Sequence, residues 1–255
     1  MESAIFTHAL RENLRIKRVL PWLVLGATLV FGFALKWSVF QNDADKGQQY
    51  ASVSSIFVFH LLALISAILT STIVNQEIEN KTIVYLLTRP VPRWKLLVFR
   101  YLACSLVVAL LSIVNTLFAT AGVYGGLSGN PMLLKDIAAL TIGAFAYGAF
   151  FMLIGLMVNR SMIVCLLFTF GWESAVPNMP GQMSYLSINS YLQAIAEHPS
   201  QGSNKGMGLL TSTLGDNTLS ASTGYIAMFI FVATLVVISS LWFTHFEYLP
   251  REDAE

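Results

Sequence analysis

Long apolar segments separated by short polar ones run through nearly the whole of this 255-residue chain. The hydrocarbon core of a bilayer is about 30 Å thick, and a helix of about 20 mostly apolar residues crosses it. Inside lipid every backbone N–H and C=O group must be paired within the segment, which a helix achieves unaided. We therefore predict an all-α membrane protein, a single transmembrane domain over residues 1–255. Its six transmembrane helices are expected at residues 20–40, 53–74, 96–125, 137–158, 161–177 and 224–246.

The composition supports a chain that lies in lipid. Hydrophobic residues make up 55% of the sequence and charged residues 11%, whereas soluble domains carry about 25% charged residues. The formal net charge of +1 gives the protein no overall field that would attract nucleic acid. A nucleic-acid partner is therefore not expected.

The fifth apolar segment is the shortest of the six. Uncharged residues extend only over 161–172 before Glu173, and Pro177 and Pro180 follow. A charged side chain is costly at the centre of a bilayer. We therefore expect this segment to cross only if Glu173 lies near the far surface.

The distribution of Lys and Arg predicts the orientation, because positive loop residues stay on the cytoplasmic side. With the N-terminus inside and six crossings, both termini are cytoplasmic. Eleven cations then lie inside: Arg11, Arg15, Lys17, Arg18, Lys81, Arg89, Arg93, Lys95, Arg100, Arg160 and Arg251. Only four lie on the opposite side: Lys36, Lys46, Lys135 and Lys205.

The N-terminal segment, residues 1–19, has the pattern of a helix that lies along the membrane surface. Phe6, Leu10 and Leu14 repeat at helical spacing, and three arginines fall on another face. An amphipathic helix of this kind places its cations toward lipid phosphates. The alternative is a solvated helical segment that leads into the first span.

Residues 75–95 form the only sizeable loop on the predicted cytoplasmic side. Glu77 and Glu79 precede a short apolar run, and acids suit the positively charged start of a helix. Pro90 disfavours helix at the residue before it. The sequence predicts a short helix followed by a rigid turn.

On the opposite side, residues 178–223 form a long external segment between the last two spans. It contains an amphipathic piece at 185–196 and then a polar tail at 198–222. Loops of this length are usually functional or mobile.

Common catalytic motifs are missing from the sequence. There is no Gly-Lys dipeptide, so the phosphate-binding loop of ATPases cannot be present, and no zinc or serine-hydrolase motif occurs. The two cysteines, Cys104 and Cys165, lie in apolar runs and do not suggest a disulfide. We expect no catalytic residues, no metal site and no cofactor in this chain.

Two ionisable residues in the spans are candidates for function, because intramembrane charges usually have a role. His60 can stay neutral and hydrogen-bond across helices. Glu173, directly after Trp172, is a candidate external gate. Its alternative role is a surface carboxylate beside a belt of interfacial aromatic residues.

The cytoplasmic loop carries a resemblance to a known family. Its residues are Glu77-Ile78-Glu79, then Thr82, then Leu86-Leu87-Thr88-Arg89-Pro90-Val91 and Arg93. This pattern resembles the ABC-2 type transporter permeases, whose coupling helix docks on a cytoplasmic ATPase. The whole plan is similar too, with an interfacial N-terminal helix and an external re-entrant segment between helices 5 and 6. The external residues that look similar are Trp172-Glu173, Pro180-Gly181, Tyr185-Leu186-Ser187 and Tyr191-Leu192.

The resemblance implies the permease subunit of an ATP-driven exporter in the plasma (inner) membrane of a bacterium. ATP and Mg²⁺ would bind to a separate ABC ATPase, present in two copies. The further partners would be a second permease chain, as a homodimer in preference to a heterodimer, and membrane lipids. The residues expected to contact the ATPase are Glu77, Glu79, Thr82, Arg89, Pro90 and Arg93, and those expected at the external gate are Trp172 and Glu173.

Two other functions fit the sequence. The first is a stand-alone secondary transporter or channel in which His60 and Glu173 bind protons. The second is a membrane scaffold that transports nothing. The resemblance at residues 77–93 favours the permease.

Overall fold

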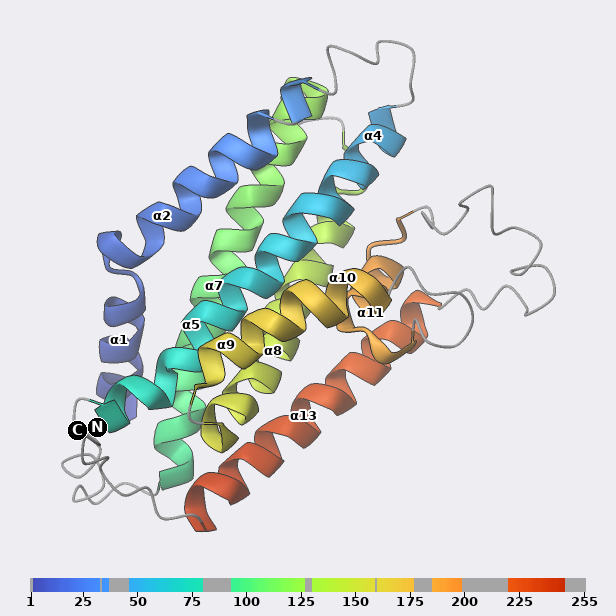
Figure 1. Ribbon diagram of the computed structural model, residues 1–255. Helices are drawn as coiled ribbons and strands as arrows, with labels where there is room; N and C mark the ends of the chain where they lie inside the picture. Colours follow the sequence, from blue (N-terminus) through green and yellow to red (C-terminus); the bar gives the residue numbers. More distant parts are fainter. Residues whose placement is uncertain are drawn as a thin grey trace.

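The computed structural model describes residues 2–32, 34–36, 46–79, 93–126, 130–158, 160–176, 185–198 and 220–245. Within these ranges every regular element is a helix, which confirms the predicted all-α class. The elements pack as one elongated bundle, in which the first four long helical stretches alternate in direction along the chain (Figure 1).

Five helical stretches are long and apolar enough to cross a membrane. The first combines α2 (Ile16–Gly26) with the π-helix η1 (Ala27–Phe31), and the second combines α4 (Lys46–Val53), η2 (Ser54–Val58) and α5 (Phe59–Glu79). The others are α7 (Arg93–Tyr124), α8 (Leu133–Met157) and α13 (Ala221–His245).

The predicted fifth span is shorter than the rest. It consists of α9 (Ser161–Leu167), η3 (Phe168–Trp172) and α10 (Glu173–Ala175). This apolar stretch, Ser161–Ala175, is below the length that identifies the other spans. The described residues therefore support five spans by length, and a sixth crossing stays a prediction.

Helix α8 forms the centre of the bundle. It packs against α5, α7, α9, α11 (Ile188–Ile195) and α13. Tyr147 and Phe151 on α8 are fully buried and stack on each other. Small residues allow the neighbouring helices to approach, as at Gly148, where an added Cβ would lie 2.7 Å from the Ser105 hydroxyl of α7.

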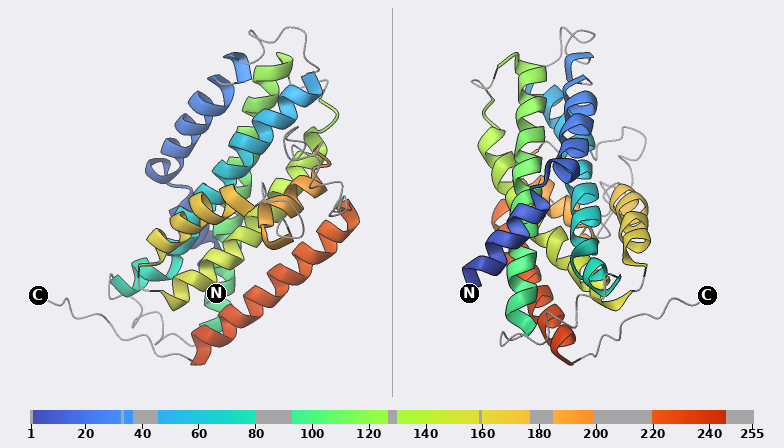
Figure 2. Two further views of the ribbon diagram at one scale, coloured as in Figure 1. Left: turned by 45° about the vertical axis from the view of Figure 1, so that its right-hand side comes forward. Right: turned by 90° about the vertical axis from the view of Figure 1, so that its left-hand side faces the viewer.

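The N-terminal helix α1 (Glu2–Asn13) is separate from α2, as the sequence predicts, and packs against α7 (Figure 2). Ala9 is buried in this contact. Arg18, just past the break, pairs with Glu12 at 3.4 Å. The position of α1 along a bilayer surface stays a prediction.

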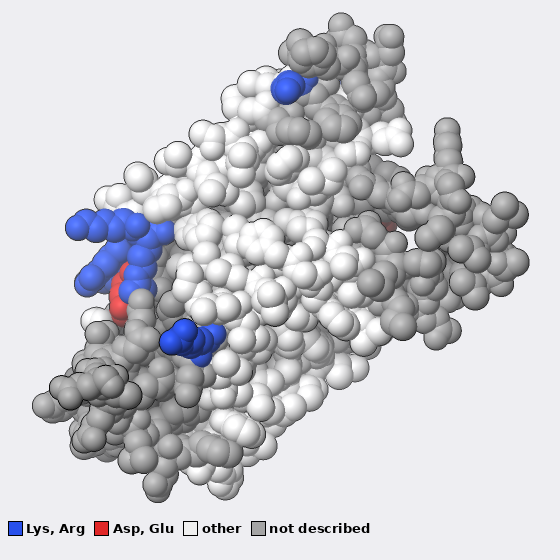
Figure 3. All heavy atoms as spheres, in the orientation of Figure 1, with Lys and Arg blue, Asp and Glu red and all other residues white. Residues whose placement is uncertain are grey.

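Charged side chains gather at the two ends of the bundle. Lys and Arg cluster beside the junction of α1 and α2, and a broad uncharged face separates them from the opposite end (Figure 3). An uncharged belt of this kind suits the hydrocarbon core of a membrane. We refer to the two ends as the α1 end and the α11 end.

The close approach of α7 to the first span depends on Gly122. A Cβ at Gly122 would lie 2.5 Å from the Ala34 Cβ and 3.3 Å from the Phe31 carbonyl oxygen, whereas a Cβ at Gly32 would meet nothing within 4 Å. Gly122→Ala should therefore destabilise the protein by about 1–3 kcal/mol, the usual cost of overpacking. Gly32→Ala is the matched control and should not lower stability. Thermal unfolding in detergent measures both, and equal melting temperatures would contradict this packing.

Candidate functional site at the ends of helix α11

Helix α11 lies across one end of the bundle, against α8 and α13 (Figure 1). Leu192 is fully buried at Gly143 of α8, where an added Cβ would lie 2.6 Å from Leu192 Cδ1. Ile195 is likewise buried at Gly224 of α13. Two glycines thus make room for the apolar face of this helix.

The N-terminus of α11 is bound by the Glu173 carboxylate, which is only 2% exposed. The Ser187 hydroxyl donates to Glu173 Oε2 at 2.6 Å, and the backbone N–H groups of Ile188 and Asn189 donate to its two oxygens at 3.1 and 3.2 Å. Ser187 is also the N-cap residue and accepts from the Ser190 N–H at 3.4 Å. The first N–H groups of a helix have no partner within it, so these acceptors complete its hydrogen bonding.

Two neighbours complete the surroundings of Glu173. Tyr147 of α8 lies close to the carboxylate. The Trp172 indole N–H donates to the Leu186 carbonyl oxygen at 3.3 Å. Helix α10 and the start of α11 are therefore joined by several hydrogen bonds, and a carboxylate at a helix N-terminus is also favoured by the helix dipole.

The C-terminus of α11 ends in a Schellman turn. The His198 N–H donates to the Gln193 carbonyl oxygen and the Glu197 N–H to that of Ala194, each at 3.2 Å. Glu197 has a φ of 52°, in the left-handed region where glycine usually closes such a turn. The turn directs the His198 side chain back toward α8.

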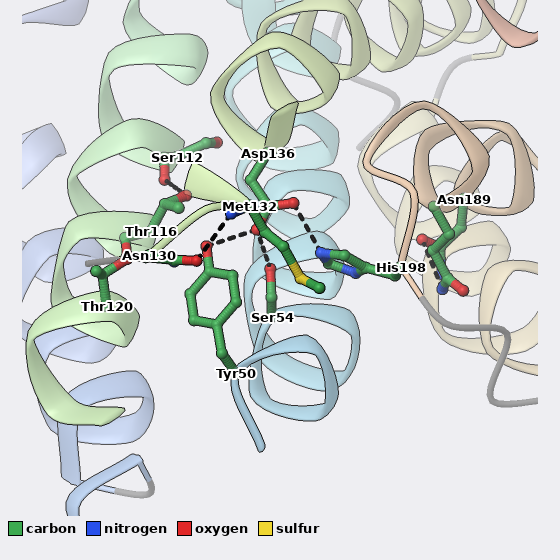
Figure 4. A network of polar contacts seen from close by, with 11 residues as sticks. Tyr50, Ser54, Ser112, Thr116, Thr120, Asn130, Met132, Asp136, Asn189 and His198 are labelled. Carbon is green, nitrogen blue, oxygen red and sulfur yellow. Dashed lines mark hydrogen bonds and ion pairs between the residues drawn. The ribbon is translucent and has the colours of Figure 1, made fainter. Parts of the chain in front are cut away.

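His198 meets Asp136, a fully buried carboxylate in the first turn of α8 (Figure 4). His198 Nε2 lies 2.7 Å from Asp136 Oδ1. The other oxygen, Oδ2, accepts from the Tyr50 hydroxyl at 2.5 Å and the Ser54 hydroxyl at 3.0 Å. One carboxylate thus joins α8, the α4–η2 helix and the segment after α11.

Further polar groups support Tyr50 from α7 and the start of α8. The Tyr50 hydroxyl lies close to Thr120 and Asn130. The Asn130 amide donates to the Thr120 hydroxyl at 3.3 Å, and its oxygen accepts from the Met132 N–H at 3.0 Å. In Figure 4, Asn130 lies beside the Tyr50 hydroxyl, which points at Asp136.

The His198 side of this network is incompletely bonded. Nε2 and Asp136 Oδ1 are 2.7 Å apart, the separation of an ion pair, and beyond this contact neither Oδ1 nor the His198 ring nitrogens have a hydrogen-bond partner among the described groups. The rings of Phe59 and Tyr50 meet the imidazole edge-on, with centroids 5.6 and 6.4 Å away. Electrostatic attraction is strong in such a dry, apolar setting.

A second, exposed ion pair lies beside the buried one. Lys135, next to Asp136, binds Glu197, next to His198. Exposed pairs usually contribute 0 to about 1 kcal/mol, so Lys135 and Glu197 mainly align the two segments. The combined arrangement fixes the position of a helix. No group of three metal-binding residues occurs in the part of the chain that the structure describes.

A family model described as "ABC-2 family transporter protein" matches residues 11–172, more than half of the chain. The chain belongs to the ABC-2 transporter family. A search among curated proteins gives no match. The match confirms the resemblance seen at residues 77–93, and it places the chain among multi-pass membrane components of ABC transporters that are not catalytic themselves.

The structure corrects one role that the sequence left open for this ABC-2 protein. Glu173 is buried and hydrogen-bonded, so it is not a surface carboxylate beside an aromatic belt. Trp172 is 44% exposed. A gating role for either residue stays a prediction. His60 is partly buried, and its Nδ1 lies 3.3 Å from the Ser55 carbonyl oxygen of its own helix.

The predicted coupling residues of the permease are described only in part. The backbone of Glu77 and Glu79 continues α5, so these residues extend the second span and do not begin a separate helix. Arg93 is the first residue of α7. Thr82, Arg89 and Pro90 lie outside the described residues.

Sequence reasoning missed Asp136 and His198. It began the fourth span at residue 137, which left Asp136 in a loop, and considered only Glu173 and His60 as intramembrane charges. A usable signal was the pair of dipeptides Lys135-Asp136 and Glu197-His198, whose charges are complementary in order. The family match ends at residue 172, so it includes Asp136 but neither α11 nor His198.

The Glu173 carboxylate should contribute far more to stability than a nearby exposed carboxylate. Glu173→Ala strands a buried hydroxyl and two backbone N–H groups, so we expect a loss on the order of 3 kcal/mol or more. Glu197→Ala, the control on the same segment, should cost less than about 1 kcal/mol. Thermal unfolding in detergent measures both. Equal losses would show that Glu173 does not anchor α11.

Proposed function

We propose that this chain is the permease subunit of an ATP-driven exporter whose ATP and Mg²⁺ bind to a separate cytoplasmic ATPase, present in two copies. The observation that carries this proposal is the family match over residues 11–172, which includes the predicted coupling segment. The sequence contains no phosphate-binding loop, so hydrolysis requires a partner. Family membership also favours this function over a stand-alone transporter with His60 and Glu173 as proton-binding groups.

The second span supports a mechanical role for the coupling segment. From Lys46 to Glu79 the chain is helical without a break, through α4, η2 and α5, a length of about 50 Å at 1.5 Å per residue. Glu77 and Glu79 lie near one end of this rod, and Tyr50 and Ser54, which bind Asp136, lie near the other. A movement imposed by an ATPase at the first end is thereby carried to the α11 end.

The charge distribution supports an orientation with the α1 end in the cytoplasm. Arg11, Arg15 and Lys17 are exposed near α1, and Arg160 is exposed between α8 and α9. Cations are retained on the cytoplasmic side of bacterial inner membranes. In this orientation Ser161–Ala175 is a short fifth crossing, α11 belongs to an external re-entrant segment, and both termini are cytoplasmic.

The position of α11 supports an external gate. It lies over the α11 end of the bundle, fixed by Glu173 and adjoining Trp172, so an exported molecule would leave only after this helix moves. Alternating access requires one closed end of this kind.

Apolar side chains on the outside of the bundle support lipids and a second permease chain as partners. Those on α13 include Ile226, Phe229, Ile230 and Leu241, each more than half exposed. A contiguous apolar surface of this kind marks contact with a membrane or with another protein. We propose a homodimer, in which part of this surface meets the second copy and the rest meets lipid.

Removing the two acids of the coupling segment tests this function. Glu77→Gln with Glu79→Gln should weaken ATPase binding about tenfold or more, because each hydrogen bond to a charged group contributes about 1.5–3 kcal/mol. The measurements are co-purification of the ATPase and ATP-driven transport in liposomes.

The matched control is Asp43→Asn with Asp45→Asn, in the loop predicted on the opposite side. This variant should bind the ATPase and transport normally. Normal coupling in the Glu77/Glu79 variant, or equal loss in both variants, would contradict the assignment of residues 75–95 to the ATPase contact.

A further inference from the structure

We propose that α11 opens as a hinged lid, pivoting at Glu173 and released at its other end when His198 separates from Asp136. This inference rests on the proposed function, because a lid matters only if a substrate passes the α11 end. Its physical basis is a difference between the two anchors of one helix.

The N-terminal anchor has the bonding of a pivot. Its donors to Glu173, namely Ser187, Ile188 and Asn189, all belong to the α11 segment. If this end moved away, the buried carboxylate would lose all three, and the helix would lose acceptors for its first N–H groups. A buried group left unpaired is costly, so this end stays in place.

The C-terminal anchor has the bonding of a latch. When His198 leaves, Asp136 keeps the Tyr50 and Ser54 hydroxyls as donors to Oδ2, so the carboxylate remains hydrogen-bonded. On the His198 side, release breaks one polar contact, that of Nε2 with Asp136 Oδ1 at 2.7 Å, whereas release at the other end would break three hydrogen bonds to Glu173. Both the closed and the released arrangement are therefore accessible, which is what a switching element needs.

The backbone next to His198 favours release in the same direction. Glu197 holds a left-handed conformation that residues other than glycine adopt at a cost. The ion pair of Glu197 with Lys135 offsets part of this backbone cost, but it lies on the surface, where solvent weakens it. Release of the turn relieves the backbone conformation and lets both exposed charges return to water.

The second span provides the means of release. Tyr50 and Ser54 belong to α4 and η2, and η2 is a π-helical segment in the half of the rod that lies nearer Asp136. Short π-helical segments often occur at functional sites. A shift of this rod moves the two hydroxyls that position Asp136, and with them the carboxylate that His198 meets.

Thiol labelling at the two ends of α11 tests the pivot in the purified chain in nanodiscs, without any ATPase. Single cysteines replace Ile195, near the latch and 1% exposed, or Ile188, at the pivot and 6% exposed, in a background with Cys104→Ala and Cys165→Ala. Adding Asp136→Asn should raise the labelling rate of Ile195→Cys at least tenfold and leave that of Ile188→Cys within twofold.

A second variant of the latch controls for a general loss of structure as the cause of the increased labelling. His198→Gln leaves Asp136 with its Tyr50 and Ser54 donors and should reproduce the selective labelling at position 195. Equal increases at 188 and 195, or no increase at 195 in either variant, would overturn the hinged lid.

Reversible cross-linking in the complex with the ATPase tests whether transport uses this movement. Lys135→Cys with Glu197→Cys, bridged by a short bis-methanethiosulfonate reagent, should lower ATP-driven transport at least tenfold, and a reductant should restore it. The control is the partly buried pair at the α1 end, Glu12→Cys with Arg18→Cys, whose bridging should have no effect.

The two experiments separate the lid from the proposed function. Full transport by the bridged Lys135/Glu197 variant would overturn the lid as a transport gate. If the unbridged complex shows no ATP-driven transport, the exporter assignment fails, and the labelling pattern in nanodiscs still decides whether α11 pivots.

Discussion

A carboxylate that is buried in an apolar bundle needs hydrogen-bond donors. The α11 end is organised around two such carboxylates. Glu173 and Asp136 are almost fully buried, and leaving such a charge without any partner typically costs about 3–5 kcal/mol. Glu173 lies near the end of the short apolar stretch Ser161–Ala175 and Asp136 lies in the first turn of α8, and each contacts one end of the α11 segment. The position of this helix therefore follows from the electrostatics of two residues, and its apolar contacts with Gly143 and Gly224 complete the fit.

The long helices of this ABC-2 protein connect the contacts at the α11 end with the other end of the bundle. The continuous helix from Lys46 to Glu79 joins the Asp136 network to the predicted ATPase contact. Asp136 itself lies in the first turn of α8, the central helix of the bundle. Helices transmit displacement well because their backbone hydrogen bonds lie within each segment. The anchors at the two ends of α11 differ in bonding, so a displacement acts on the incompletely bonded one first.

The helices could be predicted from the sequence because bilayer thickness fixes the length of an apolar run. Glu173 could be singled out because it interrupts such a run, but its partners are backbone N–H groups of α11, which no side-chain pattern reveals. The Asp136–His198 pair was not predicted, because 62 positions separate the two residues, and the complementary order of their dipeptides gains meaning only when the tertiary fold brings them together. Gly122 was identifiable as a small residue, whereas its contact with Ala34 depends on how α7 crosses the first span.

The hinged lid is tested most directly by hydrogen–deuterium exchange of the complex in lipid, with and without ATP. The amides of Ile188 and Asn189, bonded to Glu173, should stay protected in both states, whereas those of Glu197 and His198 should exchange faster when ATP is present. Faster exchange at residues 188 and 189, with unchanged protection at 197 and 198, would contradict the account.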